Sequence, residues 1–128
     1  MIGAGFAVKS SAVALAATTL ATAGVKVTLT ASGHTPKVNV RWPYSVSATT
    51  GGRAASGRLT AQIVDPLGDA HAVEFGAGSK KVVNWPFKGV FRDYLIWPPE
   101  ARGIPLTFRV TVRVGTVKRV LTYRVTPR

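Results

Sequence analysis

Residues 104–125 read IPLTFRVTVRVGTVKRVLTYRV, and this stretch decides the fold. Apolar residues occupy every second position from Ile104 to Val114, which is the period of a β-strand with one buried face and not that of a helix. Gly115 and Thr116 then form a two-residue turn with glycine in its first position, so the chain returns as a second strand. The stretch therefore predicts one long β-hairpin.

The turn also fixes the register of this hairpin. It places Val114 opposite Val117, Val110 opposite Leu121, Phe108 opposite Tyr123 and Leu106 opposite Val125. In the same register Val112 meets Arg119, and Val120 points outward. A slip of one residue would turn the apolar row to water, so the register is well specified.

The outward face of the predicted hairpin is basic. Among its threonines it carries four cations and no acid: Arg109, Arg113, Lys118 and Arg124. Arg113 lies opposite Lys118, and like charges in that position repel. These four residues are our candidate anion-binding residues. The alternative is a solvated face, on which Lys and Arg discourage pairing with other sheets.

Composition limits the class of protein. The chain has 128 residues, of which 46% are hydrophobic, so it has room for one domain with a real core. Seventeen Lys and Arg against five Asp and Glu give a net charge of +12. Such a charge favours polyanionic partners, although it also serves solubility alone. Without cysteine, the chain has no disulfide, thiol nucleophile or thiolate metal site.

Residues 1–23 differ in composition from the rest of the chain. Lys9 is their one charged residue, an apolar run follows at Ala12–Leu20, and small residues end the segment at Ala23. This order is that of a secretory signal peptide, so we expect cleavage before Gly24 and export of a single domain, residues 24–128. A flexible N-terminal segment and an extra strand remain the alternatives. The run is shorter than the about 20 residues that span a membrane, so we expect no span in the mature chain.

The rest of the chain is divided by Gly and Pro into short apolar stretches. We expect strands at Val25–Leu29, Val38–Ala48, Leu59–Ile63, Ala70–Phe75, Lys80–Trp85 and Val90–Trp97. Residues 49–56 and 65–69 are interpreted as a loop and a turn. Pro43 cannot donate to a ladder, which predicts an edge position or a bulge. With the final hairpin, the pattern favours an all-β fold, an antiparallel two-sheet β-sandwich of about seven or eight strands with Greek-key connections.

From Val25 to Pro127 the chain resembles the immunoglobulin-like or fibronectin type III-like β-sandwich domains of secreted bacterial proteins. The resemblance rests on Trp42 in an early inward row, on Tyr94 and Trp97 in a late one, and on the long final hairpin. The cysteine pair of antibody domains is absent. The resemblance implies a scaffold used in adhesion, spacing and binding, and it implies no catalytic residue.

Few residues are suited to metal binding. His34 and His71 have no partner at metal-ligand spacing, so we interpret them as structural. Asp65, Asp69 and Glu74 offer oxygen ligands near a glycine turn, but they are too few for the 6 to 8 oxygens that calcium takes. We therefore expect neither a metal nor another cofactor.

The sequence also argues against an enzyme. Asp93 and Glu100 are the one carboxylate pair to consider for hydrolysis. More simply, Asp93 pairs with Arg92 or Arg102 or accepts backbone hydrogen bonds at a corner, and Glu100 is exposed after Pro99. No nucleophile elbow, phosphate-binding glycine loop or dinucleotide fingerprint is present.

A second candidate surface interleaves rings with charges: Trp85, Phe87, Lys88 and Arg92. If these side chains lie on the surface, the rings stack on sugars or bases while the cations meet anionic groups. In the alternative interpretation, Trp85 and Phe91 fill the core.

The main hypothesis for function is a non-enzymatic binding or structural module, secreted or associated with the cell envelope. In its binding role it contacts anionic polysaccharide or another envelope polymer through the basic hairpin face. The alternative is an intracellular or particle-forming protein that binds nucleic acid or forms a coat. That alternative requires residues 1–23 to remain as an N-terminal arm.

Overall fold

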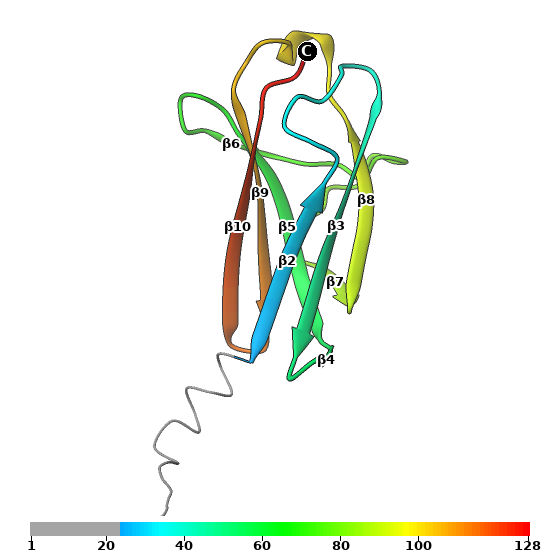
Figure 1. The fold of residues 1–128 in the computed structure, drawn as a ribbon, viewed down its shortest axis with the longest axis vertical. Helices are drawn as coiled ribbons and strands as arrows, with labels where there is room; N and C mark the ends of the chain where they lie inside the picture. The colour runs from blue at the N-terminus through cyan, green and yellow to red at the C-terminus, as the bar shows by residue number, and fades with distance from the viewer. Residues whose placement is uncertain (1–23) are drawn as a thin grey trace, which may run out of the picture.

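The structure is a computed structural model that describes residues 24–128, and these form two antiparallel sheets (Figure 1). The first sheet contains β2 (Val25–Ala31), β3 (Arg41–Thr50), β4 (Arg53–Ala54) and β8 (Val90–Ile96). The second contains β5 (Ser56–Val64), β6 (Ala70–Ala72), β7 (Trp85–Lys88), β9 (Leu106–Val114) and β10 (Val117–Val125). A short 3-10 helix, η1 (Pro99–Ala101), precedes the last hairpin. The predicted all-β antiparallel sandwich is confirmed, whereas the proposed signal segment, residues 1–23, lies outside the described residues.

The order of strands positions the basic face. In the first sheet, β3 pairs with β2 along one side and with β8 and β4 along the other. In the second, β9 lies between β10 and β5, and the far side of β5 pairs with β7 and then β6. The final hairpin is therefore the outer part of a larger sheet, with β5 as its neighbour.

The hairpin has the predicted register throughout, from Val114 opposite Val117 to Leu106 opposite Val125. Gly115 has a φ of +59°, as a turn with glycine first requires, and Val120 is 53% exposed as expected. The strand begins later than expected. The N–H of Ile104 donates to Ala101 O at the end of η1, so Ile104 belongs to that turn and is exposed.

The core fills the space between the two sheets and is centred on Trp42. This ring meets Trp97 and Phe108 edge to face at centroid distances of 5.4 and 5.5 Å. The Trp42 Nε1–H donates to Gly33 O at 3.0 Å, which satisfies its polar atom. The inward positions of Trp42 and Trp97 are confirmed, since the two residues are 3% and 1% exposed.

The prediction that Tyr94 lies in the inward row with Trp97 was wrong. Phe91, Leu95 and Trp97 are buried, so the alternation of the strand turns Tyr94 to the outer face. There it lies opposite Pro43, and the Arg41 guanidinium stands 4.4 Å from its ring centroid.

Pro43 occupies the predicted edge position. The strand β2 ends at Ala31, opposite Tyr44, so Pro43 pairs with β8 alone. On the open side its carbonyl accepts the Ser32 hydroxyl at 3.0 Å. Proline is tolerated here because no ladder partner needs its missing N–H.

Several predicted boundaries were wrong. Asn39 has a φ of 63°, so the chain turns there and Val40 is exposed instead of joining the inward row. The predicted loop at residues 49–56 contains the end of β3, a Gly-Gly turn and β4. The strand expected at Ala70–Phe75 ends at Ala72, and of the strand expected at Lys80–Trp85 only Trp85 lies in a strand, as the first residue of β7.

Val82 explains why the segment before β7 looked like a strand. It is fully buried, its N–H donates to Val73 O, and its carbonyl accepts the N–H of Ala61. Val82 thus fills the gap between β6 and β7 along β5, as one apolar residue within an irregular segment. The apolar character of Val82 correctly predicted that it is buried, but it did not predict whether the segment pairs as a strand.

Candidate anion-binding face

The candidate site is the outer face of the three strands β5, β9 and β10. Their buried residues, among them Leu59, Val110 and Val112, point to the core, so the alternate positions point to solvent. The outward positions are Arg58, Thr60, Gln62 and Val64 in β5, Thr107, Arg109, Thr111 and Arg113 in β9, and Lys118, Val120, Thr122 and Arg124 in β10. This face holds Arg58 and the four predicted cations, and none of its twelve positions is Asp or Glu.

Three of the cations lie in a row across the strands. Arg113 is directly opposite Lys118 on one side, as predicted, and directly opposite Arg58 on the other. All three residues are exposed. Neighbouring strands are about 4.8 Å apart, so the row carries three positive charges on a base of about 10 Å.

Arg58 was missed by the sequence analysis. Its alternation with Leu59 and Ala61 marks it as an outward residue of β5, and that signal was available. What the pattern did not contain was the pairing of β5 with β9, because β5 and β9 are separated by more than 40 residues of chain. The basic face is therefore wider than the hairpin.

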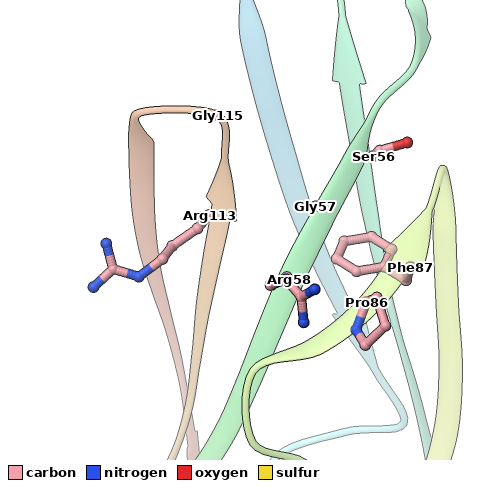
Figure 2. Close-up of a pocket in the computed structure, with 7 residues that line it drawn as sticks. All are labelled: Ser56, Gly57, Arg58, Pro86, Phe87, Arg113 and Gly115. Atoms are coloured by element: carbon pink, nitrogen blue, oxygen red, sulfur yellow. The ribbon is translucent and has the colours of Figure 1, made fainter.

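The two arginines of the row point apart. Figure 2 shows the Arg113 side chain extending away from Arg58, while Arg58 lies on the side of Pro86. The Arg58 Nη1–H donates to Asn84 O at 3.0 Å, which holds the guanidinium on that side. Like charges at this spacing repel by about 1 kcal/mol or less in water. This repulsion favours the binding of anions to the face, but it is too weak to destabilise the sheet.

Arg109 lies two rows further along the face, opposite Gln62, and is held against the sheet. Its Nε and Nη2 donate to Gln62 Oε1 at 3.2 and 2.8 Å, across the β5–β9 pair. Because both donors on one edge are taken, the guanidinium has a fixed orientation and its remaining N–H groups point away from Gln62. Arg124 lies opposite Thr107, at the far end of the hairpin from Arg113.

A hollow continues the face beyond the row of cations. It has a volume of about 600 Å³ and is lined by Ser56, Gly57, Arg58, Pro86, Phe87, Arg113 and Gly115 (Figure 2). Its lining combines two arginine residues with the carbon surface of a proline and a phenylalanine. The hollow can hold part of a ligand that is both anionic and carbon-rich.

The second predicted surface is divided between the two sheets. Trp85 is 36% exposed and packs edge to face on Phe75, and Phe87 is half-buried against the core ring of Phe91. Lys88 is exposed on β7 of the five-stranded sheet, whereas Arg92 is exposed on β8 of the other. The core interpretation is confirmed for Phe91, which is 7% exposed, and is wrong for Trp85.

The carboxylates considered for chemistry have structural partners. Asp65 Oδ1 accepts the N–H groups of Leu67 and Asp69, and Oδ2 lies 2.8 Å from His71 Nε2. The hydrogen bond with His71, and then that from the Asp69 N–H, hold the pKa of Asp65 below its ordinary value. Within residues 24–128, no group of three or more His, Cys, Asp and Glu side chains gathers around a common point.

The carboxylate of Asp93 accepts the N–H of Gly76 with both oxygens at 3.2 Å, which confirms the predicted backbone role. Burial, and then the Asp93 charge, raise the pKa of Tyr44 far above its ordinary range. Glu100 is exposed in η1, also as predicted. The other histidine, His34, stacks on Tyr123 with ring centroids 4.2 Å apart.

Comparisons with known proteins add little to this geometry. No protein-family model matches the chain, and no curated protein does. In the part that the structure describes, no helix is long and apolar enough to cross a membrane. Among solved structures, the chain is similar to a DUF4466 family protein from Parabacteroides merdae, at 14% identity and a TM-score of 0.41. The match covers 82% of this chain and 44% of that one, so the chain spans less than half of its length.

Proposed function

We propose that this protein is a non-enzymatic binding module, secreted or held at the cell envelope, that contacts an anionic polymer through the outer face of β5, β9 and β10. One observation carries the proposal: five cations share that face with no carboxylate among them. The acids of the described chain lie elsewhere, at Asp65, Asp69, Glu74, Asp93 and Glu100. An anion bound at this face would relieve repulsion between cations that nothing on the face itself neutralises.

The immunoglobulin-like or fibronectin type III-like arrangement is part of this proposal. The orders β2-β3-β8 and β10-β9-β5 correspond to A-B-E and G-F-C in immunoglobulin domains. This correspondence supports a scaffold in which one sheet face is free to bind while the other packs the core. The binding role itself rests on the charges and not on the scaffold.

A titration with poly(glycerol phosphate) tests the proposed binding. The test variant is Arg109→Ser/Arg113→Ser/Arg124→Ser, and the control is Lys26→Ser/Arg53→Ser/Arg92→Ser, which removes the same charge from the other sheet. We expect the test variant to lose at least about fivefold in affinity at low salt, the equivalent of at least one exposed ion pair. Binding of the wild type should weaken steeply as salt is added, because exposed charges are screened.

Equal affinity of the two triple variants would overturn the proposed function, since binding would then follow total charge and not this face. Mass spectrometry of the protein from its native source tests export separately. We expect a mature chain that starts at Gly24. An intact Met1 would contradict secretion and favour the alternative of an intracellular nucleic-acid or coat protein.

A further inference from the structure

We infer that the bound polymer crosses the strands, along the row of Arg58, Arg113 and Lys118, and that it is a linear polyanion of sugar or polyol units. This inference rests on the proposed function and adds three things to it: the direction of the ligand, the role of Arg58 and the class of the polymer. It follows from the placement of charge, carbon surface and hydroxyl groups around that row.

The charges are arranged in a line and not around a point. Each of the three strands contributes one cation to the row, and the residues are directly opposite one another. The guanidinium groups of Arg58 and Arg113 point apart, as Figure 2 shows. A single small anion is bound best by donors that converge on it, whereas charges spread along a line fit anionic groups repeated along a chain.

The hollow at the β5 end of the row favours a ligand with carbon between its charges. Pro86 and Phe87 form one wall, beside Ser56 and Arg58. An inorganic anion would leave that wall in contact with water. A polymer unit with a carbon backbone covers it, and this burial adds to the electrostatic attraction.

The outward positions of the three strands favour sugar or polyol units over nucleotides. None of these twelve positions holds an aromatic residue, and the rings of Phe108 and Tyr123 belong to the inward set. Single-stranded nucleic acids are bound largely by stacking of bases on exposed rings. The row beside the cations instead holds Thr60 and Thr111, which are opposite each other, together with Val120. Hydroxyl-bearing side chains are suited to ligands rich in hydroxyl groups.

Two single variants test the direction of the ligand. Arg58→Ser removes a cation from the row, and Arg124→Ser removes one from the same face at the other end of the hairpin. Poly(glycerol phosphate) should bind Arg58→Ser about fivefold more weakly than wild type, the equivalent of one exposed ion pair. It should bind Arg124→Ser, and the other-sheet control Arg53→Ser, within twofold of wild type. Melting temperatures establish that all three variants are folded.

The outcomes separate this inference from the proposed function. If Arg58→Ser binds like Arg53→Ser while the hairpin triple variant loses binding, the polymer follows the hairpin and the crossing direction is wrong. An effect of Arg124→Ser as large as that of Arg58→Ser contradicts the crossing direction in the same way. If the two triple variants bind poly(glycerol phosphate) with equal affinity, the proposed function is wrong as well.

Amide chemical shifts give a second measurement on the intact domain. Titration with poly(glycerol phosphate) should move the resonances of Gly57 and Lys118, at the two sides of the row, and leave that of Arg124 in place. An oligothymidine of equal charge should bind more weakly than poly(glycerol phosphate). Equal or tighter binding of the oligothymidine would overturn the polymer class in favour of nucleic acid.

Discussion

Gly57 of β5 lies so close to β9 that a Cβ atom on it would stand 2.8 Å from the carbonyl oxygen of Arg113. The neighbouring Arg58 is the residue paired with Arg113 across the two strands. The close approach that glycine permits and the row of cations are thus features of the same place in the sheet.

Gly57→Ala should destabilise the domain by about 1–3 kcal/mol, because the added methyl group meets backbone that cannot rotate away. Val114 Cγ2, at 3.2 Å from the same position, leaves no room on the other side. Urea denaturation measures the loss. The control is Gly78→Ala, where a Cβ would meet nothing within 4 Å. Equal urea midpoints for the two variants would contradict this prediction, since they would show that β5 and β9 accommodate the methyl group without loss of stability.

Val110→Asp and Thr111→Asp test the two faces of the hairpin. Val110 is fully buried opposite Leu121, so a carboxylate there should cost about 3 kcal/mol or more of the about 5–15 kcal/mol that small domains have. Thr111 faces out beside Arg109 and Arg113, and an acid there should cost little. Melting temperatures decide: a loss at Thr111 as large as that at Val110 would contradict the assignment of faces.

The pair of Asp65 and His71 predicts an acid-dependent contribution to stability. The folded state holds the pKa of Asp65 below its ordinary 3.8, first through His71 and then through the Asp69 N–H. A lowered pKa stabilises the fold above about pH 4, and the contribution is lost as the pH falls through the folded value. Asp65→Asn keeps an oxygen for the turn but has no charge to lose.

The melting temperature of wild type minus that of Asp65→Asn should therefore be greatest above pH 4 and shrink below it. The effect should be small and should decrease with salt, because the carboxylate is exposed. A difference that stays constant from neutral to acidic pH would mean that the pair does not stabilise the fold.

Tyr44 predicts the opposite dependence at alkaline pH. Burial, and then the Asp93 charge, raise its pKa far above the ordinary 10.0. Above that pH the unfolded chain loses the phenolic proton and the folded chain keeps it, so stability falls as the pH rises. For one such group, a rise from pH 10 to pH 11 lowers the free energy of unfolding by about 1 kcal/mol.

Urea denaturation of wild type and Tyr44→Phe at about pH 9 and pH 11 measures this dependence, since phenylalanine has no proton to lose. The free energy of unfolding should fall further in the wild type than in the variant. Parallel losses in the two proteins would place the ionising group elsewhere.

The sequence by itself determined the final hairpin. The alternation from Leu106 to Val114 and the glycine in the turn contain both the register and the division into an apolar and a basic face. These features are predictable because strand period and turn geometry depend on residues close together in the chain. For the same reason the adjacency of Arg113 and Lys118 could be stated in advance.

Only the tertiary structure decided what lies beside that hairpin. The pairing of β5 with β9 brings Arg58 to Arg113 and Gln62 to Arg109, and the gap along β5 draws Val82 into the core without a ladder. Such contacts depend on which segments pair across long loops. Tyr94, by contrast, faces outward through the local alternation of β8, in which Phe91 and Leu95 are buried. Local patterns record whether a side chain is buried or exposed, but not which distant residue it meets.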